Sequence, residues 1–157
     1  NTANAVSPLL KILNESFKNP HMKNIINLAI ETGMRRGEIL SIKTQNLMEN
    51  YIWLPDSKNG NPRKIPLTSK AKAILKLSTL PFPISSNAVR LNWNRMLKRS
   101  GITNLHFHDL RHEAISRFFE KGLSIPEVSL ISGHKDVRQL MRYTHLKVET
   151  LINKIEL

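Results

Sequence analysis

Apolar residues recur three and four positions apart along most of the chain, and this spacing predicts a mainly helical protein. A first helix is predicted to begin at Ser7 and Pro8, because a capping residue followed by proline is typical of a helix start. A second is predicted over residues 21–32, with Gly33 at its end, where left-handed backbone is often needed. The same reasoning predicts further helices over residues 68–77, 86–100, 108–121, 124–131, 137–143 and 146–157.

Two short stretches break the helical pattern and predict strands. Residues 51–55 and 64–67 have the composition of strands, and the turn-forming residues 56–63 lie between them. We therefore expect an antiparallel β-hairpin with a basic tip. The predicted fold class is mainly α with a small antiparallel β-hairpin, and a length of 157 residues suits one domain.

The chain is strongly basic, which indicates a polyanionic partner. It contains 24 lysines and arginines against 12 acidic residues, so its net charge is +12 at pH 7. Nucleic acid is the first expectation, because attraction to phosphates is long-ranged and independent of sequence. A basic surface kept for solubility is the alternative, and a membrane surface is less favoured because no single amphipathic helix collects the charge. The chain has no cysteine, which excludes disulfides and thiol nucleophiles and fits a reducing compartment.

Several side chains have the chemistry needed to act on a phosphodiester. Arg35 lies at a junction between two predicted helices, and Lys58 lies in the predicted hairpin tip. His108 and Arg111 are three residues apart and therefore share a helix face. The three histidines between positions 106 and 112 also suggest a metal, but they do not all share a face, and no acidic or cysteine ligand completes a set. A histidine that moves a proton beside a fixed cation is the interpretation we favour.

A tyrosine near the end of the chain is the candidate nucleophile. Gly133 and His134 form a predicted turn, and the helix that follows carries Arg138, Arg142 and Tyr143. We interpret Tyr143 as a nucleophile directed at a DNA phosphate. A short helix, a turn and a second helix also describe a non-catalytic helix-turn-helix DNA reader, which would use the two arginines. The third interpretation of the tyrosine is half-buried packing with a hydrogen-bonded hydroxyl.

Four segments follow one another in an order and spacing that match a known family. They are TGMRRGEIL at residues 32–40, the hairpin tip with Lys58, HDLRH at residues 108–112, and Gly133-His134 followed by Tyr143-Thr144-His145. These segments resemble, in turn, the first arginine box, the lysine turn, the His-x-x-Arg box, and the final histidine and nucleophile of the tyrosine recombinases, or phage-integrase family. The resemblance is greatest to integrases of phages, prophages and integrative elements.

The resemblance implies which residues form the active site and which surround it. The implied catalytic residues are Arg35, Lys58, His108, Arg111, His134 and Tyr143, and Glu38 matches an acidic residue that supports the site. Ser132 stands where the family often has leucine, and we interpret this as a packing change without effect on the chemistry. Further candidates for DNA contact are Arg36, Arg63, Lys64, Arg90, Arg95, Arg138 and Arg142. The resemblance implies neither a metal nor a cofactor.

The same resemblance implies a reaction and an assembly. The expected product is a 3′-phosphotyrosine with a free 5′ hydroxyl, used for DNA integration or excision without ATP. A nicking-closing topoisomerase with the same chemistry is an alternative. The expected partners are double-stranded DNA, other copies of the chain in a tetramer, and DNA-bending accessory proteins. Residues 7–146 are expected to form the catalytic core and residues 147–157 a tail that docks on a neighbouring copy. The family's core-binding and arm-binding domains are expected to be absent here, and the location to be cytoplasmic, at the nucleoid of a prokaryote.

Overall fold

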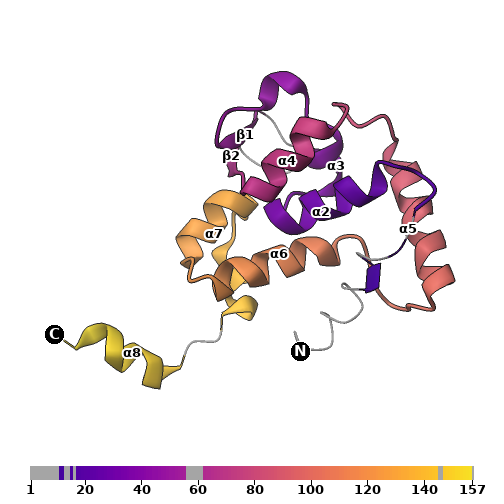
Figure 1. The fold of residues 1–157 in the computed structure, drawn as a ribbon. Helices are drawn as coiled ribbons and strands as arrows, with labels where there is room; N and C mark the ends of the chain where they lie inside the picture. Colours follow the sequence, from indigo (N-terminus) through magenta and orange to yellow (C-terminus); the bar gives the residue numbers. More distant parts are fainter. Residues whose placement is uncertain (1–10, 13–14, 16, 56–61, 145–146, 157) are drawn as a thin grey trace.

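The computed structural model describes residues 11–12, 15, 17–55, 62–144 and 147–156 (Figure 1). Helix α2 (Met22–Thr32) lies at the centre and packs against α6 (Asp109–Glu120) and α4 (Ser69–Leu77). Its apolar residues recur at helical spacing and are buried, and Gly33 ends it with a φ of 71°. The predicted helix over residues 21–32 is therefore confirmed, together with its glycine end.

A two-stranded antiparallel sheet lies beside these helices and confirms the predicted hairpin. Strand β1 (Tyr51–Leu54) pairs with β2 (Arg63–Pro66), with Ile52 opposite Ile65. Side chains alternate between the two faces, so Arg63 and Ile65 are buried while Lys64 is exposed. The strand begins one residue earlier than predicted, and its register decides which of two adjacent basic side chains faces inward.

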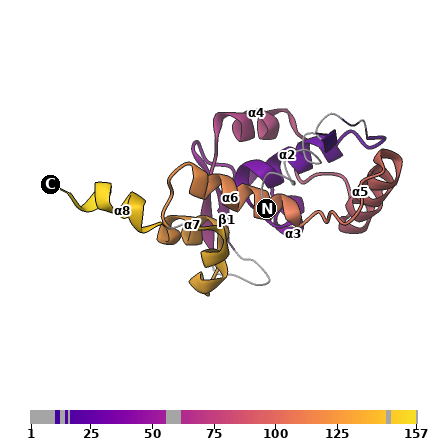
Figure 2. The same cartoon turned by 90° about the horizontal axis from the view of Figure 1, so that it is seen from below.

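Helix α5 (Ser86–Ser100) forms one end of the molecule and matches its predicted bounds (Figure 2). The Ser85 side chain accepts a hydrogen bond from a first-turn amide, and Gly101 ends the helix with a φ of 67°. Trp93 is 2% exposed, contacts the Phe107 ring edge-on and donates through its indole N–H to the Leu105 carbonyl. These contacts join α5 to the loop before α6. The short helices α3 (Arg36–Leu40) and η1 (Thr44–Asn46) connect α2 to the sheet.

A second, smaller apolar cluster packs the two segments that follow α6 against that helix. Helix α7 (Ile125–Ser132) and the 3₁₀ helix η2 (Val137–Tyr143) pack against α6 around Ile115, Val128 and Leu140. Ser124 caps α7 and Asp136 caps η2, and the predicted helix over residues 137–143 is a 3₁₀ helix. Because Leu140 is fully buried, it anchors η2 and thereby places Tyr143, which packs against the same cluster.

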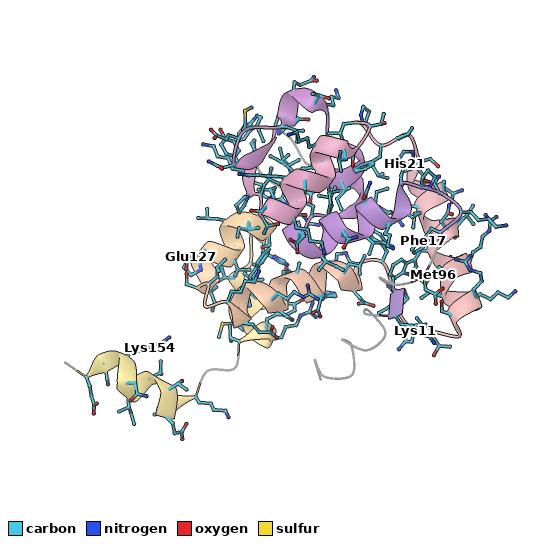
Figure 3. All side chains as sticks on the ribbon, in the orientation of Figure 1. Lys11, Phe17, His21, Met96, Glu127 and Lys154 are labelled. Atoms are coloured by element: carbon cyan, nitrogen blue, oxygen red, sulfur yellow. The ribbon has the colours of Figure 1, made fainter. Side chains whose placement is uncertain are left out.

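Helix α8 (Val148–Ile155) stands apart from the rest of the molecule, and none of its residues is buried. Figure 1 shows this helix projecting away from the core, and in Figure 3 its side chains, Lys154 among them, lie apart from those of the core. Within the described residues, no helix combines the length and the apolar character needed to cross a membrane. The predicted helix start at Ser7 and the hairpin tip with Lys58 lie outside the described residues.

Candidate active site

Arg111 holds the C-terminal ends of two helices together. Its side chain is 3% exposed, and it donates from Nη1 to the Gly33 carbonyl and from Nη2 to the Ser132 carbonyl, each at 2.7 Å. The last carbonyls of a helix lack intrahelical partners and favour a cation. Arg111 supplies that cation to the C-terminal ends of both α2 and α7. Burial, followed by the charge of Arg35, lowers the pKa of Arg111 to about 10, so the guanidinium stays charged at neutral pH.

His134 lies next to Arg111, and its surroundings assign its tautomer. Its Nδ1 lies 2.6 Å from the Ser132 hydroxyl and 3.4 Å from Nη2 of Arg111. Arginine only donates, so Nδ1 is an acceptor, the serine hydroxyl donates to it, and the ring proton sits on Nε2. Burial and then the charges of Arg111 and Arg35 lower the pKa of His134 to about 4, so the ring is neutral at pH 7. Our interpretation of Ser132 as a mere packing change is therefore wrong, because its hydroxyl orients this histidine.

Arg63 and Glu38 form a buried ion pair beside these groups. Nη1 of Arg63 donates to Oε2 of Glu38 at 2.7 Å, Nη2 donates to Oε1 at 2.8 Å, and Nε donates to the Ile131 carbonyl at 2.9 Å. The exposed fractions of the two side chains are 6% and 9%. Gly133 is needed at this point, because a Cβ there would lie 3.1 Å from the Arg63 guanidinium and the local φ is +74°. Arg63 was expected to contact DNA; in this fold each of its three guanidinium nitrogens instead donates to a group inside the protein.

The pKa of Glu38 is set by two opposing effects, burial of the carboxylate and the hydrogen bonds that it accepts. Burial by itself raises it, but the hydrogen bonds from Arg63 and from the Arg35 backbone N–H outweigh burial, and the net pKa lies below the ordinary value of 4.5. The same carboxylate lies 3.8 Å from Nη1 of Arg35, whose side chain is 30% exposed. The Glu38 carboxylate therefore lies close to both arginines, and Arg63 neutralises its negative charge.

A cavity of about 620 Å³ opens in front of Arg35. Its walls come from the start of α3, one face of α5 and the loop before α6. Besides Arg35 it is lined by Arg36, Gly37, Ser86, Arg90, Trp93, Asn94, Leu105, His106, Phe107 and His108. Arg35 and Arg36, which are adjacent in the sequence, thus both line this cavity, and His108 lines it too.

Tyr143 contacts His112 rather than His108. Its hydroxyl is hydrogen-bonded to Nδ1 of His112, and Nη2 of Arg142 donates to the same hydroxyl at 2.8 Å. His108 touches only the edge of the His112 ring, with 5.0 Å between ring centroids, and among the described residues no hydrogen bond joins His108 to Tyr143. The histidine that we interpreted as moving a proton beside a fixed cation, His108, is therefore not the one that meets the hydroxyl. The spacing of four residues between the histidines, which puts them on one face of α6, was the signal for His112.

The sequence profile described as the phage integrase family matches residues 2–150. The chain belongs to the phage integrase family. A shufflon-specific DNA recombinase of Escherichia coli is 40% identical over 147 residues, which are 88% of this chain and 38% of that protein. Tyrosine recombinase XerA of Saccharolobus solfataricus is 31% identical over 153 residues, 92% of this chain and 52% of that protein. The chain thus spans only part of the length of these relatives.

A solved structure gives the same classification of the fold. The Tn1549 transposon integrase, in complex with circular intermediate DNA, matches with a TM-score of 0.72 and 17% identity, over 100% of this chain and 64% of that one. The predicted tyrosine-recombinase catalytic fold is confirmed. Within this integrase-family domain, segments far apart in the sequence bring Arg35, His108, Arg111, His134 and Tyr143 toward one region. Burial and then the charges of Arg111 and Arg35 lower the pKa values of both histidines, and Tyr143 acts on that of Arg111.

The remaining predicted residues lie in different surroundings. Lys64 is exposed, with its ammonium 5.0 Å from the centre of the Tyr51 ring, and Arg95 is exposed on α5. Arg138 is paired with Asp136 at 2.9 Å. Lys58 lies outside the described residues. Within the described part of the chain, no group of three or more histidines and carboxylates is arranged to hold a metal ion.

Proposed function

We propose that this domain is the catalytic part of a site-specific DNA recombinase in which Tyr143 cleaves and rejoins DNA through a 3′-phosphotyrosine. The task we assign to it is integration or excision of a phage or integrative element. Membership of the integrase family supports the proposal, as does the name of its E. coli relative, a shufflon-specific DNA recombinase. Double-stranded DNA is the proposed substrate, in keeping with the net charge of +12.

The proposed chemistry assigns each group to one part of the phosphodiester. The phenolic oxygen of Tyr143 bonds to phosphorus as the bond to the 5′ oxygen breaks. Arg35 and Arg111 stabilise the charge on the non-bridging oxygens, and Nε2–H of His134 donates a further hydrogen bond. Lys58 is the proposed acid that gives the departing 5′ oxygen its proton. The bond energy is kept in the phosphotyrosine, so a second strand rejoins by the reverse reaction.

The observation that carries this proposal is an excess of positive over negative charge among the described residues of the site. Among the described residues, Glu38 and Asp109 are the acidic groups that act on the site. Arg63 already neutralises Glu38, and Asp109 is outnumbered by Arg35, Arg111 and Arg142 in its effect on His108. His108 and His134 both have pKa values lowered by burial and then by the charges of Arg111 and Arg35. Side chains held in a positive potential of this kind favour a bound anion, and a phosphodiester supplies one at the position where charge develops.

The helix-turn-helix alternative is less compatible with the arrangement of its two arginines. Arg142 is turned back onto Tyr143 and His112, and Arg138 pairs with Asp136. A plain DNA reader would present such side chains to base edges. The segment after the turn is also a short 3₁₀ helix rather than a recognition helix.

Covalent trapping tests the proposal directly. The full chain is incubated with a pool of labelled duplexes of randomised sequence, each nicked so that the short strand released by cleavage diffuses away. We expect a denaturation-resistant protein–DNA adduct that is absent in Tyr143→Phe, and sequencing of the trapped DNA would give the site. Binding without any adduct would refute the recombinase and favour the DNA reader. Relaxation of arbitrary supercoiled plasmid would instead identify a topoisomerase.

We also propose that α8 docks on a neighbouring copy when the protein assembles as a tetramer on DNA. Its apolar side chains lie three, four and seven residues apart and are exposed, at 71% for Val148, 39% for Leu151, 47% for Ile152 and 77% for Ile155. An apolar stripe of this kind favours a partner surface. Deletion of residues 147–157 is expected to leave DNA binding by one copy intact and abolish the higher complexes in a gel-shift titration. Unchanged higher complexes would contradict this docking.

A further inference from the structure

We propose that His112 is the catalytic residue that accepts the proton of Tyr143 during DNA cleavage. This inference rests on the proposed role of Tyr143 as nucleophile, and it gives His108 the separate task of contacting the phosphate. The two histidines are one helical turn apart on α6, so the sequence alone does not say which of them meets the tyrosine. Their surroundings in the fold separate them.

The rings on α6 determine where Tyr143 lies. Its ring stacks on that of His112, with 5.9 Å between centroids and 29° between planes. It also stacks on the Phe119 ring, at 6.4 Å and 17°. His112 and Phe119 are seven residues apart and therefore share one face of the helix. Contacts with both rings hold the phenol against α6, with its hydroxyl at the His112 imidazole.

Counting donors and acceptors shows which way the hydrogen bond runs. Nη2 of Arg142 lies 3.0 Å from Nδ1 of His112 and 2.8 Å from the Tyr143 hydroxyl. Because arginine has no acceptor, Nδ1 carries no proton and the phenolic oxygen accepts from Arg142. The hydrogen between the phenol and Nδ1 is then the phenol's own. The hydroxyl of the nucleophile already donates to a nitrogen that is free to take its proton.

Burial and the charges around His112 keep its imidazole neutral at neutral pH, so that its nitrogen is available as a proton acceptor. Burial, followed by the charges of Arg142, His108 and Arg111, lowers the pKa of His112, while Asp109 acts in the opposite direction. The imidazole is therefore neutral before the reaction. Arg142 also stabilises the phenolate that forms beside it.

The proposed step is balanced in atoms and charge. The proton moves from the Tyr143 oxygen to Nδ1 of His112 as the oxygen–phosphorus bond forms. The bond from phosphorus to the 5′ oxygen breaks, and that oxygen takes a proton from a different acid, for which Lys58 is the candidate. On rejoining, the 5′ hydroxyl attacks phosphorus and gives its proton back to the acid that supplied it, for which Lys58 is the candidate, while the proton on His112 returns to the phenolic oxygen. His108, which lines the cavity in front of Arg35, is left free for the phosphate.

Single-turnover cleavage of the trapped suicide substrate tests the inference with matched histidine variants. His112→Gln keeps a polar side chain without a titrating nitrogen and is expected to slow adduct formation by about 10²–10⁴-fold, the usual contribution of a general base. It is also expected to remove the rise in rate as the imidazole loses its proton, while DNA affinity stays unchanged. Added imidazole is expected to restore part of the rate of His112→Ala and none of the rate of the control, His108→Ala. Cleavage by His112→Gln within about threefold of the parent, with the same pH profile, would overturn the inference.

A spectroscopic measurement tests the same hydrogen bond without cleavage. In the free protein, Tyr143→Phe removes the hydroxyl donor, so the ¹⁵N resonance of His112 Nδ1 is expected to move toward that of a less strongly bonded nitrogen. An unchanged resonance would count against the contact. The two hypotheses fail in different ways: a parent chain without adduct refutes the nucleophile and everything built on it. A reactive parent with an equally reactive His112→Gln refutes only the role of His112.

Discussion

Replacing Arg63 by methionine should destabilise the domain without weakening its intrinsic contact with DNA. The change leaves Glu38 buried beside an apolar side chain and removes the hydrogen bond to the Ile131 carbonyl. Breaking one partner of a buried pair costs about 3–5 kcal/mol, and the contacts that Glu38 keeps with Arg35 place the loss toward the lower end of that range. The exposed fractions of 6% and 9% mean that solvent screening does little to reduce this cost. For a domain of this size, about 2–4 °C per kcal/mol gives a fall in Tm of about 6–20 °C.

Lys64→Met is the matched control, since it removes the adjacent positive charge from the exposed face of the same strand. We expect it to change stability by no more than about 0.5 kcal/mol. If Lys64 contacts a phosphate, the slope of log affinity against log salt should become shallower by about 0.9, and Arg63→Met should leave that slope unchanged. Urea unfolding and salt-dependent fluorescence anisotropy with the same duplex measure the two quantities.

The pair of variants distinguishes two opposite roles for Arg63. The double change Glu38→Gln with Arg63→Met removes both charges and should recover part of the stability lost in the single variant, because no unpaired charge remains buried. A loss below about 1 kcal/mol in Arg63→Met, together with a reduced salt slope, would refute the buried-pair reasoning and return Arg63 to the DNA interface.

Three further predictions follow from the same network. Because the pKa of Glu38 is lowered on folding, its stabilising contribution is present above the ordinary carboxyl value of 4.5 and is lost as pH falls through the folded-state pKa. Urea midpoints measured at descending pH should show this loss of stability. The loss should be smaller in Arg63→Met. Ser132→Ala removes the hydroxyl that orients His134 and should slow adduct formation by about tenfold, as expected for a net hydrogen bond of about 1–1.5 kcal/mol, whereas Ser129→Ala, which loses a bond to the His134 carbonyl, should have less effect. Binding of vanadate should raise the pKa of His134 from about 4, as followed by NMR, because the anion offsets the charges of Arg111 and Arg35; no change on binding would place the anion elsewhere.

Local chemistry was enough to predict most of the helices and the hairpin. Helix α5 was predicted with its observed bounds from the spacing of its apolar residues, and the structure shows a Ser85 cap and a left-handed end at Gly101 that act within a few residues. The order and spacing of the candidate site residues were also available from the sequence without any tertiary information. These residues are Arg35, His108, Arg111, His134 and Tyr143. Periodicity and capping depend on neighbours along the backbone, so the sequence by itself determined them.

Only the tertiary structure decided which side chains meet. The strand register turned Arg63 inward to Glu38, 25 residues earlier in the chain, although Arg63 and Lys64 are equivalent as a basic pair in the sequence. In the same way, the stacking of Tyr143 on α6 selected His112 over His108, and the end of α7 brought the Ser132 hydroxyl to His134. The partner of a buried charge and the proton position on an imidazole depend on groups that folding brings together from distant segments, and no local pattern carries that information.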